Sequence, residues 1–341
     1  MPSQKVGIGR FIGNTRPSFF IDDLGKIKAG IMKMRTTHEI VLRTIFGIVL
    51  LLSLTVFSAS CQKPEKSAGP KEKVTIGVGS GGLSLPFIIA REKGFFQEEG
   101  LDATIRIYPS GVRATEAMYA GEVDSSGLGD TQIVLDSFMR DDFAVFATFA
   151  YSYDNIKVIG RKDRGVGKPA DLKGKKIGTA ATMGMHFFVH VYLTEHGIGP
   201  SAIKMVDFVP KDLPGALEEG KVDAIAIYEP YASEAMKALP DKAVKLPQSD
   251  LYKQTFNLAV MKSYAKEHPG LLKKILKAVD RAITFIKQNR NESIAAMTKG
   301  LKPGEELLVS VQDDLVFELS LEQSLLTILE DEARWAIANK F

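Results

Sequence analysis

The sequence predicts an α/β fold built from two similar lobes. An eight-residue pattern, Ala-(Met/Leu)-x-x-Gly-x-Val-Asp, occurs at residues 117–124 and again at residues 216–223. In each copy a helix is expected to end at the glycine, as a left-handed C-terminal cap requires, and an apolar strand follows. Strands also alternate with helices of about ten residues, which favours a mainly parallel sheet. A duplicated β-α-β-α-β unit would make two lobes with a cleft between them.

The first lobe is expected to begin with residues 74–160. Its predicted strands are apolar runs bounded by glycine, proline or polar residues. They lie at residues 74–78, 103–108, 123–127, 143–150 and 155–160. Helices are expected between them, at residues 86–93, at 110–120 and from residue 130 on. The strand at residues 155–160 is expected to lead out of this lobe.

The second lobe is expected in residues 161–253 and repeats the same order of elements. Its predicted elements are a strand ending at residue 178, a helix at 179–196, a strand at 203–209 and a strand at 224–227. Residues 254–341 are then expected to return to the first lobe through a strand at 255–261. Two long amphipathic helices follow, at 268–289 and 321–338. Because the chain would cross twice between the lobes, the sequence predicts a hinge.

Residues 1–60 are predicted to hold a secretory signal behind an N-terminal extension from a wrongly assigned start codon, with Met32 or Met34 as the natural start. The apolar run at residues 45–57 is too short for a membrane-spanning helix, which needs about 20 residues. Small residues and then Cys61 follow it. This order resembles a bacterial lipoprotein signal, in which Cys61 would carry the lipid. The alternatives are an ordinary cleaved signal and an uncleaved anchor.

Residues 61–73 are rich in lysine, proline and glycine, which predicts a flexible tether behind the lipidated cysteine. A lipid, a tether and a globular body together predict an exported protein. It would be anchored through its N-terminal lipid at the periplasmic or outer face of a bacterial membrane.

Composition argues against several other functions. The chain has 44 Lys or Arg and 41 Asp or Glu residues, and its basic excess lies before Cys61, so no basic patch predicts nucleic-acid binding. That cysteine is the only one, which leaves the globular body without a thiolate nucleophile or thiolate metal site. His186 and His190 have the spacing of a metal pair, but Phe187 stands where the metalloprotease pattern needs glutamate. We therefore expect no enzymatic activity, no cofactor and no metal.

Small polar residues gather where predicted strands end and helices begin. In open α/β sheets ligands bind at this edge, where glycine allows close approach and helix N-termini offer N–H groups. The candidate ligand-binding residues at these junctions are Ser80, Gly81, Gly82, Ser110, Gly111, Gly129, Asp130, Thr131, Thr179 and Thr182. At any single junction such residues can serve only as helix caps, which contribute about 1 kcal/mol. Together they predict a site for a small polar or anionic molecule.

Five further residues are candidates for the same site. Arg113, one turn into a predicted helix, could make a bidentate contact with a sulfonate or carboxylate; its alternative is an exposed helical arginine. Tyr228 and Glu229 end a strand of the second lobe, and Tyr151 lies near the first crossing. His186 lies early in a helix and could face the cleft, although a lone histidine more often has a structural role.

The ordered motifs resemble those of the nitrate/sulfonate/taurine-type substrate-binding proteins of ABC importers. They are Ser80–Gly82, Arg91–Phe96, Glu99–Leu101, Gly121–Asp124, Asp171–Ile177, Gly220–Ala224 and Tyr228–Pro230. The resemblance covers roughly residues 73–290. It implies a type II periplasmic-binding-protein fold, two α/β lobes joined by a two-crossing hinge.

The resemblance also implies a function. A monomer would capture a small-molecule ligand by hinge closure and deliver it to an ABC permease and its ATPase. Two alternatives come with it. One is an enzyme on the same fold, of the thiamine-pyrimidine or menaquinone-pathway type, and the other is a solute-sensing lipoprotein.

Overall fold

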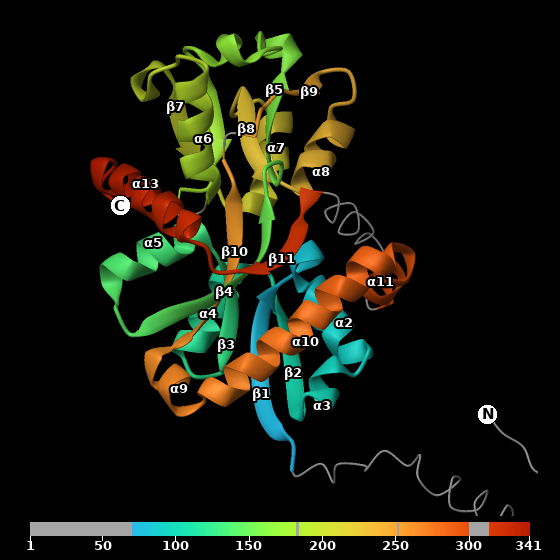
Figure 1. The fold of residues 1–341 in the computed structure, drawn as a ribbon. Coiled ribbons are helices and arrows are strands. Elements are labelled where there is room, and N and C mark those ends of the chain that lie inside the picture. The colour runs from blue at the N-terminus through green and yellow to red at the C-terminus, as the bar shows by residue number, and fades with distance from the viewer. Residues whose placement is uncertain (1–69, 182–183, 251, 300–313) are drawn as a thin grey trace, which may run out of the picture. The chain divides into compact units, whose positions relative to one another are not determined.

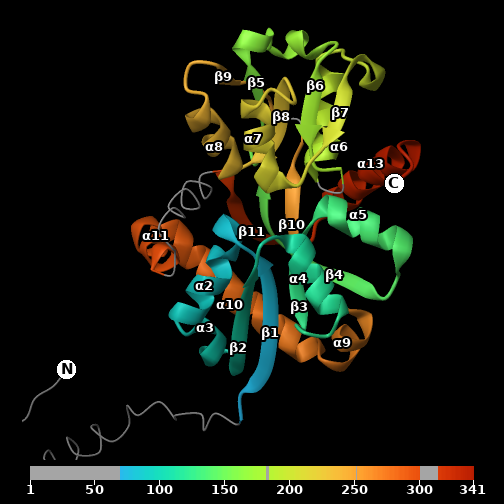
Figure 2. The same cartoon turned by 180° about the vertical axis from the view of Figure 1, so that it is seen from behind.

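The computed structural model describes residues 70–181, 184–250, 252–299 and 314–341, which lie in one compact unit. The predicted signal, Cys61 and residues 61–69 of the predicted tether fall outside the described residues, and so does Thr182. No helix within the described ranges combines the length and the apolarity that crossing a bilayer requires. The body has two sheets with helices on their faces (Figures 1 and 2).

The first sheet has six strands in the order β11-β4-β10-β3-β1-β2. Their bounds are β1 Glu72–Gly79, β2 Leu101–Tyr108, β3 Ser125–Gly129, β4 Phe143–Ser152, β10 Gln254–Met261 and β11 Val316–Ser320. β1 pairs parallel with β2 and β3, whereas β10 runs antiparallel between β3 and β4. The return strand predicted from the sequence is therefore an inner strand of the first sheet.

The second sheet has five strands in the order β7-β6-β8-β5-β9. Their bounds are β5 Ile156–Arg161, β6 Lys176–Thr179, β7 Lys204–Asp207, β8 Ala224–Tyr228 and β9 Ala243–Lys245. β6 pairs parallel with β7 and β8, and β5 runs antiparallel between β8 and β9. The parallel strands β7-β6-β8 thus match β2-β1-β3 of the first sheet in chain order and direction, and an antiparallel strand, β5 or β10, lies next to the third of them in each sheet. This confirms the predicted duplication.

The repeated octapeptide has the same structural role in both lobes. Gly121 and Gly220 have φ values of 74° and 71°, which confirms the left-handed caps. At each cap the glycine N–H and the following N–H donate back to the last helical turn, the two bonds of a Schellman motif. The aspartate of each copy then accepts from the backbone of an inner strand, Asp124 from Thr75 N of β1 at 2.7 Å and Asp223 from Lys176 N of β6 at 2.9 Å. The motif therefore fixes a helix end to an inner strand of its sheet.

Helices cover both sheets. Their bounds are α2 Leu85–Glu92, α3 Phe95–Glu98, α4 Gly111–Tyr119, α5 Asp130–Met139, α6 Gly184–Glu195, α7 Leu213–Glu218, α8 Tyr231–Ala238, α9 Lys262–Glu267, α10 Pro269–Gln288, α11 Arg290–Thr298 and α13 Gln323–Ala338. Short 3-10 turns lie at Gly81–Ser84, Lys162–Arg164, Pro169–Leu172, Pro200–Ala202 and Pro210–Asp212. Figure 1 shows α10 lying across one face of the first sheet. Its apolar residues pack there against the sheet and form the core of the first lobe. Each lobe thus has its own core.

The boundary between the lobes differs from the expectation. The sequence assigned residues 155–160 to the first lobe, but β5 belongs to the second sheet. All six of its residues are buried, and such a strand needs neighbours on both sides, which β8 and β9 supply. The first crossing therefore lies at residues 153–155 and the second at residues 246–253, between β9 and β10.

The tail helix contacts both lobes, although the sequence assigned it to the first. α13 follows β11, the edge strand of the first sheet, and lies beside α5 (Figure 1). Its second half turns toward the other lobe, where Trp335 and Ala336 are buried in the core. α13 is thus a further connection between the lobes.

Candidate functional site

A cavity of about 310 Å³ lies between the two lobes. Seven of the residues predicted for the site line it: Ser80, Gly81, Gly82, Ser110, Gly111, Tyr228 and Glu229. They come from the ends of β1, β2 and β8 and from the turns that follow. The two lobes therefore bring together residues that are far apart in the sequence, as expected for a cleft at the carboxyl ends of strands.

Glycines allow the first lobe to form the floor of this cavity. A Cβ atom on Gly79 would lie 3.0 Å from the backbone nitrogen of Gly111, and one on Gly111 would lie 3.0 Å from the carbonyl oxygen of Gly127. The start of α4 therefore lies directly on the ends of β1 and β3. Ser110 caps this helix, since its Oγ accepts from Arg113 N at 3.3 Å. The N-terminus of α4 thus borders the cavity through Ser110 and Gly111.

Replacing Gly79 by alanine is expected to destabilise the fold by about 1–3 kcal/mol, because the new methyl group would meet backbone atoms that cannot rotate away. Urea unfolding followed by circular dichroism measures this cost. Gly215→Ala is the matched control, since its Cβ would meet nothing within 4 Å in α7. Equal stability of the two variants would contradict the close approach at the cavity floor.

Several predicted residues lie outside the cavity lining. Gly129 is the N-cap of α5, and Asp130 and Thr131 begin that helix and are buried. Thr179 ends β6 and is also buried. Arg113 is exposed and forms an ion pair with Glu116 one turn along α4. None of these five residues is in the cavity lining of this structure.

Tyr151 and His186 also lie outside the lining. The Tyr151 ring packs against Tyr153 and lies under the Lys253 ammonium, 4.2 Å from the ring centroid. His186 packs edge-on against Trp335 and Phe341, and burial lowers its pKa. The tail of the chain therefore packs against His186.

The cavity has lining residues that sequence reasoning missed. Asn155 and Gln254 lie at the two crossings, Tyr231 follows the Tyr-Glu-Pro motif, and Phe149 and Phe256 come from β4 and β10. Asn155 and Gln254 had a usable signal, because residues beside the crossings lie near the boundary between the lobes. The two phenylalanines had none, since a phenylalanine in an inner strand is usually a core residue.

The charges around the cavity are few. Among the lining residues that the structure describes, Glu229 is the one ionisable carboxylate, and none is lysine, arginine or histidine. Glu229 accepts from Ser233 N at 2.9 Å in the first turn of α8. Over the described part of the chain, no group of three or more His, Cys, Asp or Glu side chains could hold a metal ion. Apart from Glu229, these residues therefore offer a ligand neutral donors, acceptors and rings.

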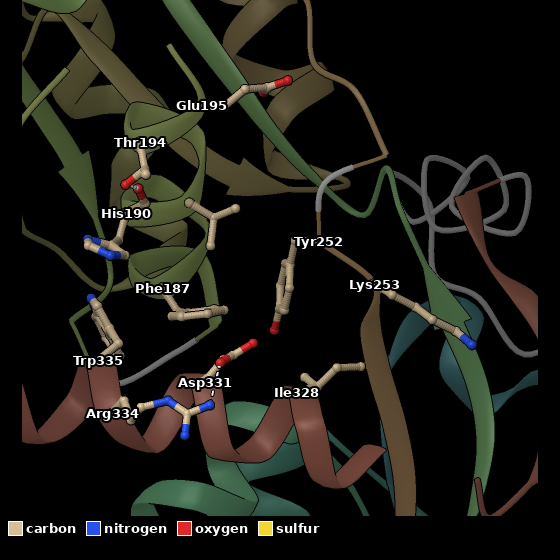
Figure 3. A pocket seen from close by; sticks show the side chains of 11 residues that line it. Phe187, His190, Thr194, Glu195, Tyr252, Lys253, Ile328, Asp331, Arg334 and Trp335 are labelled. Atoms are coloured by element: carbon tan, nitrogen blue, oxygen red, sulfur yellow. Dashed lines mark hydrogen bonds and ion pairs between the residues drawn. The ribbon is translucent and has the colours of Figure 1, made fainter. Parts of the chain in front are cut away.

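A wider hollow of about 710 Å³ lies between α6 and α13 (Figure 3). Figure 3 shows Phe187 of α6, Tyr252 of the second crossing and Trp335 of α13 around it, with the Arg334–Asp331 ion pair along the helix. It includes none of the predicted site residues. This hollow is the outer part of the contact between α13 and the second lobe.

Two buried carboxyl groups, those of Asp130 and Glu332, lie next to this contact and share the Tyr252 hydroxyl. Asp130 accepts from Thr255 N at 2.7 Å and from Tyr252 Oη at 2.8 Å, and the same Oη lies 2.8 Å from Glu332 Oε1. Burial raises the pKa of Asp130 to about 6, although the hydrogen bonds that its carboxylate accepts act to lower it. Burial and the nearby charge of Asp130 raise the pKa of Glu332 to about 9. The phenol has one proton to donate, so a protonated Glu332 supplies the second. The chain Glu332–Tyr252–Asp130 thus ties α13 to the second crossing and to α5.

Comparison with known proteins supports this fold. The chain is 28% identical, over 72% of its length and 76% of the relative's, to a Bacillus subtilis (strain 168) protein assigned as an aliphatic sulfonates-binding protein. It is 25% identical to the taurine-binding periplasmic protein of Escherichia coli (strain K12), over 62% of this chain and 68% of the relative.

The crystal structure of the periplasmic aliphatic sulphonate binding protein SsuA from Escherichia coli superposes with a TM-score of 0.68 at 20% identity, over 79% of this chain and 93% of that one. The two-lobed periplasmic-binding-protein fold is thereby confirmed. The family model described as "NMT1/THI5 like" matches residues 83–293. With its duplicated lobes, its cleft and this match over more than half its length, the chain belongs to the NMT1/THI5-like family.

Proposed function

We propose that this protein is the extracytoplasmic solute-binding component of an ABC importer. It captures a small polar or anionic organic solute, of the sulfonate, nitrate, taurine or pyrimidine-like kind, and delivers it to the membrane permease and its ATPase. The observation that carries the proposal is the cavity itself, which is lined by both lobes and by both crossings. Its relatives, described as sulfonate- and taurine-binding proteins, support the class of solute.

The proposed mechanism is capture by hinge closure. A solute in the cavity contacts Ser80 and Ser110 from the first lobe and Tyr228 from the second. Because these contacts exist together only when the lobes are close, the solute binds the closed state better and shifts the population toward it. A micromolar affinity, about −8 kcal/mol, would be ordinary for such a site. The closed protein would then be the form that a permease recognises.

A thermal-shift screen over sulfonates, taurine, nitrate and small ring compounds tests the proposal. A solute at 100 times its dissociation constant is expected to stabilise the protein by about 2.7 kcal/mol. Small-angle scattering with the best compound should show a smaller radius of gyration. Tyr228→Ala should weaken this response, whereas Tyr264→Ala, outside the cavity lining, should not. Absence of any stabilising compound together with an unchanged radius would contradict solute capture by closure.

We also propose that a lipid on Cys61 holds the protein, as a monomer, at the periplasmic or outer face of a bacterial membrane. The apolar run and small residues before Cys61 support it. Labelling cells with a palmitate analogue should modify the native chain and leave Cys61→Ser unlabelled and released. Equal labelling of both chains would contradict the anchor.

A further inference from the structure

The tail helix α13 is held by different lobes at its two ends. Its first end follows β11, and the pairing of β11 with β4 ties it to the first sheet. Its second end is held by side-chain packing, since Trp335 and Ala336 are buried in the core of the second lobe. Between these ends, Leu329 packs against buried residues of both lobes. Backbone pairing therefore fixes α13 to the first lobe, and packing fixes it to the second.

The stiffness of α13 couples this arrangement to the hinge. The helix runs without interruption over 16 residues. Because its backbone hydrogen bonds hold it straight, it cannot follow two lobes that rotate relative to each other. Rotation about the crossings must therefore bend the helix or free one of its ends. The end held by packing can leave without breaking the backbone hydrogen bonds of a sheet.

The end that can leave carries Trp335. The centroid of its six-membered or five-membered ring system lies 5.4 Å from that of Phe187 and 5.2 Å from that of His186, both in α6. The Phe187 ring is in turn 5.3 Å from Tyr252 of the second crossing. The hollow of about 710 Å³ borders Phe187, Tyr252 and Trp335 (Figure 3), so this contact is not filled as a protein core is. Separating it costs less than opening a closed core.

The two lobes also meet directly beside this contact. Gly184 begins α6, and a Cβ atom there would lie 3.2 Å from Thr131 Oγ1 of α5 and 2.8 Å from Gln254 Nε2 of β10. Both neighbours belong to the first lobe, and α5 and α6 are in contact. Turning the Gln254 side chain could make room for one methyl group, whereas a leucine at Gly184 is expected to separate the two helices.

We propose that α13 is a latch on the hinge: its Trp335 end docks on α6 when the lobes are together and must leave α6 before the cleft can open. The inference rests on the hinge closure proposed above. None of Phe187, Tyr252 and Trp335 lines the 310 Å³ cavity. Weakening the latch would therefore raise the open fraction, and lower the affinity for a solute by the same factor as the closed fraction, with every cavity residue unchanged.

Distance measurement between two spin labels, without any solute, tests the latch. The labels are placed in the full chain by Ser137→Cys on α5 and Ser201→Cys after α6, both exposed, and Cys61→Ser removes the native thiol. Trp335→Ala frees the end of the helix and Gly184→Leu separates α5 from α6. Each is expected to lengthen the mean distance between the labels by several ångströms, and Trp335→Phe, which keeps a ring, should restore most of the native distance.

Two matched variants serve as controls. Ile337→Ala lies on α13 but is 66% exposed, and Gly215→Leu lies in α7, where a Cβ atom would meet nothing within 4 Å. Neither should change the distance. If Trp335→Ala does not fold, Gly184→Leu decides, because separation of the lobes relieves its clash.

The outcomes separate the latch from solute capture. Native distances in both Trp335→Ala and Gly184→Leu would overturn the latch and leave solute capture to the thermal-shift screen. Equal lengthening in the two controls would also overturn it, because the distance would then not depend on the Trp335 contact. Lengthening in the test variants alone, together with a screen in which no compound stabilises the protein, would support the latch and reject solute capture.

Discussion

Replacing Glu332 by glutamine is expected to remove most of the stability loss that the native protein shows as the pH rises toward 9. Glu332 is fully buried, and burial together with nearby Asp130 raises its pKa to about 9. In the unfolded chain the same carboxyl ionises near its ordinary value of 4.5. Between these two values the folded protein holds a proton that the unfolded chain has released. Stability is therefore full below about pH 4.5 and falls as the pH rises, by up to about 1.4 kcal/mol per pH unit.

Ionisation of Asp130 also lowers the stability of the protein as the pH rises, but over a lower pH range. Burial raises its pKa from 3.8 to about 6, so its part of the loss is complete by about pH 6. Tyr252, which joins the two carboxyl groups, stays protonated throughout, because burial raises its pKa well above its ordinary value. The fall in stability between about pH 7 and 9 therefore comes mainly from Glu332, because burial lowers the pKa values of His186 and His190 and their contribution to stability rises only up to about pH 7.

Guanidinium unfolding at steps from pH 5 to pH 9 measures this slope. Glu332→Gln keeps the shape of the side chain and can donate to Tyr252 Oη at every pH, so its stability should change little above pH 6. Glu330→Gln on the exposed side of α13 is the matched control and should keep the native slope. A native protein whose stability is flat from pH 6 to 9 would show that Glu332 is not held protonated.

Trp335→Ala is expected to destabilise the protein by about 3–5 kcal/mol, the usual range for removing a buried indole. The ring is 6% exposed and lies edge-on to Phe187 at 5.4 Å and to His186 at 5.2 Å, and Phe341 stacks on it at 5.1 Å. Its loss would remove most of the contact between α13 and the second lobe. We expect amide exchange in α13 and α6 to rise together, because each helix covers the other.

Urea unfolding gives the free energy, and hydrogen exchange by mass spectrometry locates the loosened segments. Ile337→Ala, two residues along the same helix and 66% exposed, should cost less than about 0.5 kcal/mol. A Trp335→Ala variant that is as stable as Ile337→Ala would mean that the tail is not part of the second core.

The sequence was sufficient for the parts of the fold that depend on local rules. Gly121 and Gly220 must adopt a left-handed conformation, and that requirement, repeated with the same neighbours, revealed the duplication. The junctions after β1 and β2 were also predictable, because helices that begin at a sheet edge direct their N-termini toward the cleft. Ser80 and Ser110 therefore lie in the cavity as the pattern indicated.

The remaining features depend on packing over long distances. The strand Ile156–Arg161 is equally apolar on both faces, so nothing in it tells which sheet it joins. Asp130 lies at a strand-to-helix junction like the other candidates. Its carboxylate instead accepts hydrogen bonds from Tyr252 and Thr255, which lie more than 120 residues later in the sequence. His186 could not be placed without the tail that covers it. The positions of these residues depend on tertiary contacts, which a local sequence pattern does not show.

The position of β10 constrains how the polypeptide can acquire its structure during synthesis. This strand lies between β3 and β4, yet it leaves the ribosome after the whole of the second lobe. The first sheet cannot close until residue 261 has been made, whereas the second sheet is encoded without interruption from residue 156 to residue 245. The nascent N-terminal half therefore lacks an inner strand of its sheet, and the second sheet, although translated later, is the first whose strands are all present.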